Sequence, residues 1–185
     1  MSTIKKNHTT PTLMSAILRL SLLCVFLMLS WSALAQDTPC EKDNAALQAM
    51  YPSMVSFQSN SATEKNIPSI TVKTADTNAT RSAGFQRVCA STIAATPILF
   101  LFARPVTPSF HMNNVVAALD IAFIDEQGKI ESIQSMQPYS LLLLKKPLYS
   151  PSRAIVAALE TRPGFYADNG IVVGDTVTWL TQATE

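Results

Sequence analysis

Apolar and polar residues alternate in short runs along the second half of the chain, which is the pattern of β-strands. Residues 70–74 read Ile-Thr-Val-Lys-Thr, and such alternation predicts a strand with one face in water. Residues 98–102 are wholly apolar, which predicts a strand buried on both faces. Further strands are predicted over residues 110–112, 118–124, 129–136, 154–159 and 176–180.

Turn residues separate these runs. Asp125-Glu126-Gln127-Gly128 lies between two predicted strands, so we expect a hairpin there. Residues 104–109 contain two prolines, which predicts a turn. Residues 56–68 are mostly polar and are expected to form a loop.

Two short helices are expected among the strands. Asp76 or Thr77 can cap a helix that continues through Arg87, because either side chain offers an oxygen to the unpaired N–H groups of the first turn. Pro163-Gly164 opens a second helix, which ends at Asn169-Gly170, where glycine can adopt the left-handed conformation. The pattern therefore predicts a mainly β (α+β) fold.

The N-terminal residues 1–35 have the features of an export signal. Basic residues precede an apolar run over 20–34, and Ala33-Leu34-Ala35 matches the small-x-small site of signal peptidase, with cleavage expected before Gln36. The run is shorter than the roughly 20 residues that cross a bilayer. We therefore expect a periplasmic or extracellular protein with no stable membrane anchor after cleavage.

Cleavage divides the rest of the chain into two parts. Residues 36–68 are expected to be an N-terminal extension, in which 41–50 has helix-forming residues. Residues 69–185 are expected to form a single domain. A mature chain of roughly 150 residues is large enough to bury a core.

The charge balance excludes some partners. The chain has 14 Lys and Arg against 13 Asp and Glu, and three of the basic residues lie in the predicted signal. The mature chain is therefore close to neutral, and its sequence shows no basic patch. No nucleic-acid partner is expected.

Cys40 and Cys89 remain after cleavage. Two thiols in a small exported domain are expected to pair as a disulfide, because the compartment is oxidising. The alternative is a reactive Cys89 thiolate, which would need a cation nearby to lower its pKa. Arg87 is the neighbour that could supply this charge.

Polar side chains stand beside predicted strands around residue 111, and they form the candidate ligand-binding site. An asparagine side chain is costly to bury unless it is hydrogen-bonded, so adjacent asparagines indicate either a ligand site or a turn. An arginine could hold a carboxylate of the ligand or pair with an aspartate of the chain. The candidate residues are Arg81, Phe110, His111, Asn113, Asn114 and Asp120.

In the binding hypothesis, Arg81, His111, Asn114 and Asp120 surround a shallow polar pocket and Phe110 forms its apolar floor. In the structural alternatives, the asparagines form a turn and Arg81 pairs with Asp120. Each alternative assigns the same residues to the stability of the fold rather than to a ligand.

A catalytic alternative is a hydrolase that uses Cys89 or Ser109 as nucleophile with His111 as base. Neither nucleophile lies in a recognised motif such as Gly-x-Ser-x-Gly. No metal site or cofactor is expected, because the mature chain has one histidine and its cysteines are expected to pair.

Four segments, in order from Ile70 to Leu180, resemble the domain of unknown function 192 family, also called uncharacterised protein family 0127. These segments are 81–87, 98–102, 110–120 and 158–175. The resemblance implies a small, mainly β, barrel-like domain with a mixed sheet, often exported, and no established reaction. It also implies that His111 stands where the family usually has Trp, which favours a flat ring over proton transfer at this position.

Together these observations predict an exported, non-catalytic domain that binds a small ligand or an envelope partner.

Overall fold

Seven strands form one mixed sheet in the described part of the chain. The computed structural model describes residues 40–61, 67–140 and 144–180. The predicted signal peptide, residues 1–35, lies outside these ranges. The strands are β1 (Tyr51–Gln58), β2 (Ile70–Ala75), β3 (Ile98–Val106), β4 (Leu119–Ile124), β5 (Ile130–Met136), β6 (Ile155–Thr161) and β7 (Thr176–Leu180).

The sheet has the strand order β5-β4-β6-β3-β2-β1-β7. β2 and β3 pair in parallel, and the other neighbours pair antiparallel. β4 and β5 form the predicted hairpin, in which Asp125 accepts hydrogen bonds from the backbone of Gln127 and Lys129. The mainly β prediction is confirmed, and so is the mixed sheet.

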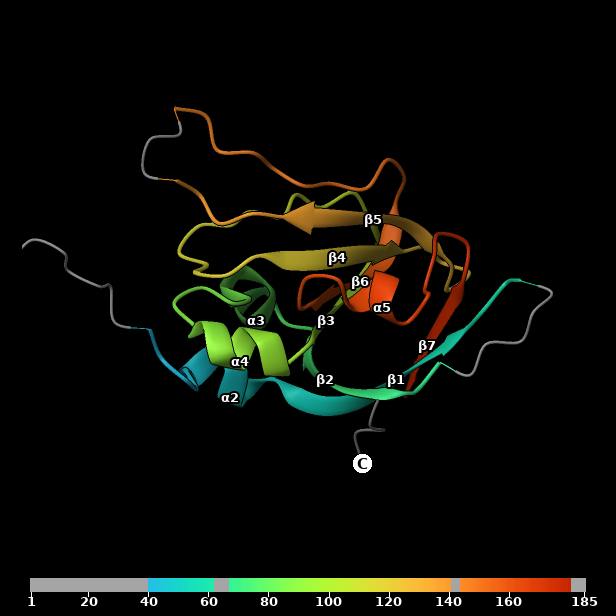
Figure 1. Cartoon of the computed structure of the whole chain (residues 1–185), viewed down its shortest axis with the longest axis horizontal. Coiled ribbons are helices and arrows are strands. Elements are labelled where there is room, and N and C mark those ends of the chain that lie inside the picture. Colours follow the sequence, from blue (N-terminus) through green and yellow to red (C-terminus); the bar gives the residue numbers. More distant parts are fainter. Residues whose placement is uncertain (1–39, 62–66, 141–143, 181–185) are drawn as a thin grey trace, which may run out of the picture. The chain divides into compact units, whose positions relative to one another are not determined.

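The sheet curves into a half-barrel, and the two edge strands meet at one end (Figure 1). The start of β5 reaches the start of β7, where Ile130 N donates to Asp175 O at 2.9 Å and Val177 N donates to Gly128 O at 2.7 Å. Gly128 has a φ of 75°, and a Cβ there would lie 2.9 Å from Val177 O. Only glycine fits this contact without a shift of the backbone.

Four short helices lie in the described residues, where the sequence predicted two. They are α2 (Ala45–Ala49), α3 (Asn78–Ala83), α4 (Ala90–Ala95) and α5 (Phe165–Asp168). Thr77 caps α3 in a capping box with Thr80. The prediction that this helix continues through Arg87 is wrong, because Gly84, with a φ of 47°, ends it and a new helix begins after Cys89.

Three predicted elements differ from the structure. Residues 56–68 were expected to be a loop outside the domain, yet β1 extends through Gln58 and pairs with both β2 and β7. Residues 104–106 belong to β3 rather than to a turn, after a register irregularity beyond Leu101. Residues 110–112 are not a strand, because only Phe110 forms a bridge, to Tyr149.

The sheet buries apolar side chains on both faces. Side chains alternate along each strand, so Ile98 and Phe100 of β3 enter one core while Leu99 enters the other. The first core also contains residues of α2 and α4, and Figure 1 shows α2, α3 and α4 grouped together. The second core contains Tyr166 of α5. No helix in the described ranges is long and apolar enough to span a membrane.

A disulfide joins the start of the described chain to the turn before α4. Cys40 and Cys89 are bonded, as predicted from the sequence. Backbone hydrogen bonds lie beside the disulfide, with Glu41 N donating to Arg87 O at 2.8 Å and Cys89 N donating to Glu41 O at 3.0 Å. The segment before α2 is thereby fixed to the body of the domain.

Replacement of Cys40 and Cys89 together by Ser should lower the free energy of unfolding by about 2–4 kcal/mol, because the bridge closes a long loop in the unfolded chain. The loop spans a sequence separation of 49. Urea unfolding of both proteins, with and without dithiothreitol, measures the effect. Dithiothreitol should destabilise the wild type and leave the double variant unchanged; equal stability of the two oxidised proteins would contradict the prediction.

Candidate functional site

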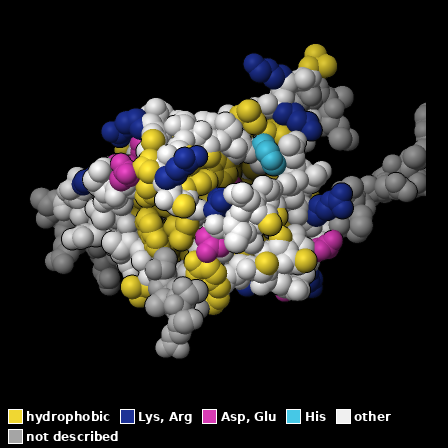
Figure 2. Space-filling view, turned by 180° about the vertical axis from the view of Figure 1, so that it is seen from behind, with side chains coloured by type: hydrophobic (Ala, Val, Ile, Leu, Met, Phe, Trp, Pro, Cys, Tyr) yellow, Lys and Arg dark blue, Asp and Glu magenta, His cyan; other side chains and the backbone are white. Residues whose placement is uncertain are grey.

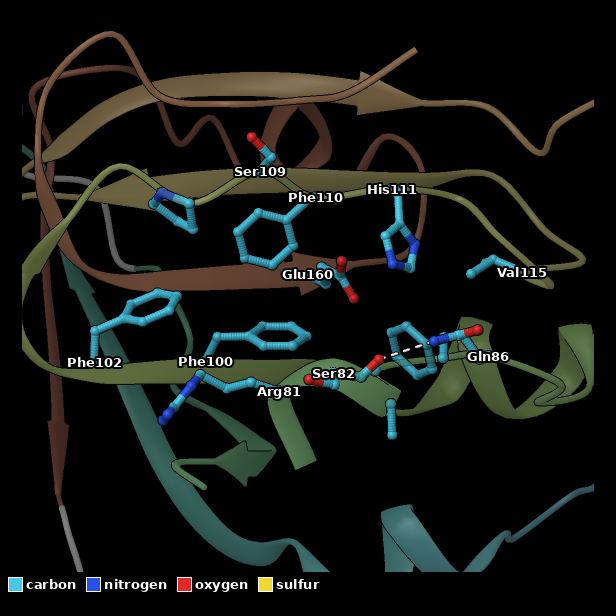
Figure 3. Close-up of a pocket in the computed structure, with 14 residues that line it drawn as sticks. Arg81, Ser82, Gln86, Phe100, Phe102, Ser109, Phe110, His111, Val115 and Glu160 are labelled. Atoms are coloured by element: carbon cyan, nitrogen blue, oxygen red, sulfur yellow. Dashed lines mark hydrogen bonds between the residues drawn. The ribbon is translucent and has the colours of Figure 1, made fainter. Parts of the chain in front are cut away.

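A cavity of about 250 Å³ opens between α3 and the first-core face of the sheet. Its lining comes from α3 and the turn that follows it, from Phe100 and Phe102 on β3, from residues 108–111 with Val115, and from Glu160 on β6. Figure 3 shows these side chains arranged around a common space. Pockets for drug-sized ligands measure about 300–1,000 Å³, so this cavity suits a small molecule.

The floor of the cavity is aromatic. The ring of Phe110 meets the ring of Phe100 edge to face, with centroids 5.1 Å apart, and lies 5.7 Å from the ring of Phe123. Phe100 is fully buried, at 2% exposure. Figure 2 shows apolar side chains gathered on one face of the molecule, with a histidine beside them.

Glu160 is the one carboxyl group among the residues that line the cavity. Its side chain is 5% exposed, and within the described chain it forms no hydrogen bond or ion pair. No fully enclosed side-chain oxygen or nitrogen among the described residues lacks a partner, so the carboxyl oxygens of Glu160 must be open to the cavity. Figure 3 shows them directed into it. Burial raises the pKa of Glu160 to about 8, which keeps the group protonated at neutral pH.

Asp120 is not part of this cavity. In the β4–β6 ladder, Ile121 lies opposite Glu160 and Asp120 lies opposite Thr161. Adjacent residues of a strand point to opposite faces, so Asp120 faces the second core. There it accepts hydrogen bonds from Ser135 Oγ at 2.6 Å and from Gly164 N at 2.7 Å. Asp120 therefore fixes the entry to α5.

Arg81 lines the cavity, but its guanidinium group is already engaged. It donates to Leu101 O at 2.8 Å, to Asn78 Oδ1 at 2.6 Å and also to Asp76 O. Its Cζ atom lies 5.5 Å from the centre of the Phe102 ring. The Arg81–Asp120 pair that the sequence offered as a structural alternative is not formed, because the two residues lie on different faces of the sheet.

Phe110 and His111 line the cavity as the binding hypothesis requires, whereas Asn113 and Asn114 do not. His111 is exposed, and its Nδ1 accepts a hydrogen bond from Asn113 N at 3.4 Å. Asn113 Oδ1 accepts one from Lys146 Nζ at 3.1 Å. The Asn113 side chain is thus bonded to another residue of the chain.

Asn114 forms a turn at the rim of the cavity. Its φ is 56°, a left-handed conformation that asparagine tolerates better than most residues. Its carbonyl oxygen accepts from Arg87 N at 2.7 Å, and its side chain donates to Gln86 Oε1 at 3.2 Å. Of the two interpretations of the asparagines, this geometry favours the turn.

The proposed catalytic pairs are not assembled. Cys89 is in the disulfide and has no free thiolate, so the Cys89 alternative is wrong. Ser109 Oγ forms its hydrogen bond with Ser150 Oγ at 3.0 Å, and Figure 3 shows the hydroxyl directed away from His111. In the described residues, no group of three or more His, Cys, Asp or Glu side chains could hold a metal ion.

Glu160 was not among the functional residues predicted from the sequence. The predicted strand ended at Leu159, whereas β6 continues through Thr161. The sequence feature that could have indicated Glu160 is its position as an acidic residue directly after an apolar run. The face to which the Glu160 side chain points follows from that of Leu159, because adjacent residues of a strand point to opposite faces. Leu159 is in the second core.

Comparisons with known proteins place the chain in a family. The profile of the DUF192 family, described as "Uncharacterized ACR", matches residues 59–179, and the chain belongs to this family. No curated protein matches the chain. The fold is similar to that of a candidate transcription regulator from Sinorhizobium meliloti 1021, with a TM-score of 0.58 and 22% identity over 70% of this chain and 95% of that one.

A second solved structure with this fold is a protein of unknown function from Novosphingobium aromaticivorans DSM 12444. It has a TM-score of 0.55 and 20% identity, and the match covers 75% of this chain and 99% of that one. At these identities the two structures support the fold alone.

Glu160→Gln should remove a pH dependence of stability. The pKa of Glu160 is raised from its ordinary value of 4.5 to about 8 in the folded chain, so the unfolded chain releases this proton at a lower pH. The contribution of Glu160 to the free energy of unfolding is fully present below the pKa that this group has in the unfolded chain. It is lost as the pH rises through the folded pKa, with a slope of at most about 1.4 kcal/mol per pH unit.

Urea unfolding in steps between about pH 4 and pH 9, which span both pKa values, measures this loss. The exposed Glu126→Gln variant is the control and should keep the wild-type profile. Parallel profiles for wild type and Glu160→Gln would show that the carboxyl group is not buried as described.

Proposed function

We propose that this member of the domain of unknown function 192 family binds a small organic molecule in the cavity and does not catalyse a reaction on it. The observation that carries the proposal is the Glu160 carboxyl group, which is buried, faces the cavity and has no partner in the described chain. Buried polar groups are almost always hydrogen-bonded. A ligand that bonds to Glu160 would supply this partner.

The rest of the lining suits a ligand with an apolar body. Phe100 and Phe110 offer ring surface next to Glu160, and burial of apolar ligand surface contributes about 25 cal/mol per Å². His111 and Ser82 are exposed residues at the cavity and can contact the outer part of the ligand. A mainly apolar pocket with a few polar groups is typical of small-molecule sites.

A binding role without catalysis agrees with the state of the nucleophiles. A serine nucleophile needs a base within hydrogen-bond reach, whereas Ser109 is bonded to Ser150 and directed away from His111. The only carboxyl group in the lining has a raised pKa and no nucleophile bonded to it.

We also propose that the protein is exported to the periplasm or the extracellular space. The support is the N-terminal sequence, with its basic residues, apolar run and Ala33-Leu34-Ala35 site, together with the Cys40–Cys89 disulfide. Disulfides persist in oxidising compartments and are rare in the cytosol.

N-terminal sequencing of the protein recovered from its own cells tests this proposal. The mature chain should begin at Gln36 and should leave the cells on osmotic shock or be found in the medium. A chain that keeps residues 1–35 and stays with the cytosolic fraction would contradict export.

Ser82→Trp should abolish ligand binding, because Ser82 lies on α3 at the cavity and an indole would occupy much of the available volume. Native mass spectrometry of protein purified from its own cells under mild conditions measures the bound molecule. The matched control is Ser91→Trp, at another exposed serine, which lies on α4 and does not line the cavity. Wild type and Ser91→Trp should carry the same small molecule, and Ser82→Trp should lose it at least about tenfold.

Equal occupancy in the two tryptophan variants would place the ligand elsewhere. Near-ultraviolet circular dichroism checks that the Ser82→Trp protein is folded. We expect it to fold, because Ser82 is exposed.

A further inference from the structure

We propose that the ligand carries a protonated amine, which binds the Glu160 carboxyl group while its hydrocarbon part packs on Phe100 and Phe110. The inference rests on the proposed function and narrows it to one chemical class. It is argued from the protein groups that surround Glu160 and from the kinds of ligand group that the cavity can hold next to it.

No described residue donates a hydrogen bond to Glu160. Its strand neighbours are Ile98 on β3 and Ile121 on β4, which are fully buried apolar residues. Backbone N–H groups of the central strands are engaged in the ladders between β3, β6 and β4. The bonding partner of the carboxyl group must therefore come from the cavity.

Two residues of the lining, Arg81 and His111, can carry a positive charge, and neither is bonded to Glu160. Arg81 on α3 directs its guanidinium N–H groups to Leu101 O, Asp76 O and Asn78 Oδ1. His111, on the segment that covers the cavity, has its Nδ1 bonded to the Asn113 backbone. The neighbouring acid on β4, Asp120, lies on the other face of the sheet. Among the described residues, Glu160 is thus the only acidic group that a ligand in the cavity meets.

An ammonium group gains more from the carboxylate form of Glu160 than a neutral or an anionic group does. Hydrogen bonds with an ionised donor or acceptor are roughly twice as strong as neutral ones. Aromatic rings also attract cations through their faces, and Phe100 and Phe110 lie beside Glu160 in the cavity. A carboxylate ligand could accept a hydrogen bond from the protonated form of Glu160 only, and it is repelled once this group ionises above about pH 8.

Binding of an amine should also depend on pH. Burial holds the proton on Glu160 until about pH 8 in the free protein, and a bound ammonium favours the carboxylate. Binding therefore releases a proton to solvent below about pH 8, and the affinity rises with pH until the amine itself loses its charge. Arg81 and His111 are the other charged or titratable groups that face the cavity, and they are present in every variant compared below.

Three probes of the same size and different charge test the proposal: benzylamine, benzyl alcohol and benzoate. Each probe is titrated into the protein in the form that is recovered from its own cells. The titration is done at about pH 8.5, where an alkylamine is still largely protonated, and again at a pH about two units lower. The amide NMR signals of Gly84 and Phe110 report binding in the cavity. The proteins are wild type, Glu160→Gln and, as a matched control, the exposed Glu126→Gln.

The expected result is that benzylamine binds wild type and Glu126→Gln roughly tenfold or more tightly than benzyl alcohol does. The difference should vanish in Glu160→Gln and shrink at the lower pH. Because wild type alone compares the amine with its neutral analogue, the test does not depend on how well Glu160→Gln folds.

Two results would overturn the inference, and they differ in what they mean for the proposed function. If benzyl alcohol or benzoate shifts the cavity signals as strongly as benzylamine does, the amine class is wrong while the cavity remains a ligand site. If no probe shifts these signals at millimolar concentration, both the amine class and small-molecule binding in this cavity are wrong.

Discussion

A strand that is buried on both faces must direct each polar side chain either to a partner or to a cavity, because an unpaired buried polar group is costly. β4 and β6 are such strands, and each contains one acid that is nearly enclosed, Asp120 and Glu160. Asp120 is satisfied by Ser135 and by the backbone of Gly164. Glu160, on the opposite face, has only the cavity. The two-residue period of the strands thus separates a structural acid from a candidate binding acid.

The sequence predicted those elements whose pattern was local. β2 alternates, β3 begins with an apolar run, and the hairpin between β4 and β5 has its own turn residues, so these elements could be recognised without tertiary information. β1 was missed because Pro52 and its serines weaken the pattern, and its stability comes from pairing with two strands distant in sequence. The short helix α4 lacks a side-chain cap, so no sequence signal marked its start.

The candidate site was predicted in part, for a related reason. Arg81, Phe110 and His111 do meet at one cavity, and their sequence segments indicated polar or aromatic groups next to apolar strands. Asp120 was assigned to the wrong face because its orientation depends on the register of β4 against β6, which local patterns do not show. Glu160 was missed because the end of β6 was placed one residue before it.

The disulfide and the cavity are connected through a single glutamine. The Cys40–Cys89 bridge holds the segment that leads into α2, and Asn44 of this segment donates to Gln86 O at 3.2 Å. The side chain of Gln86 donates to Ser82 O at 2.8 Å and accepts from Asn114 Nδ2 at 3.2 Å. Gln86 therefore ties the N-terminal segment, the end of α3 and the Asn114 turn to one another at the edge of the cavity. Because these three segments lie at the edge of the cavity, the disulfide helps to hold that edge in place.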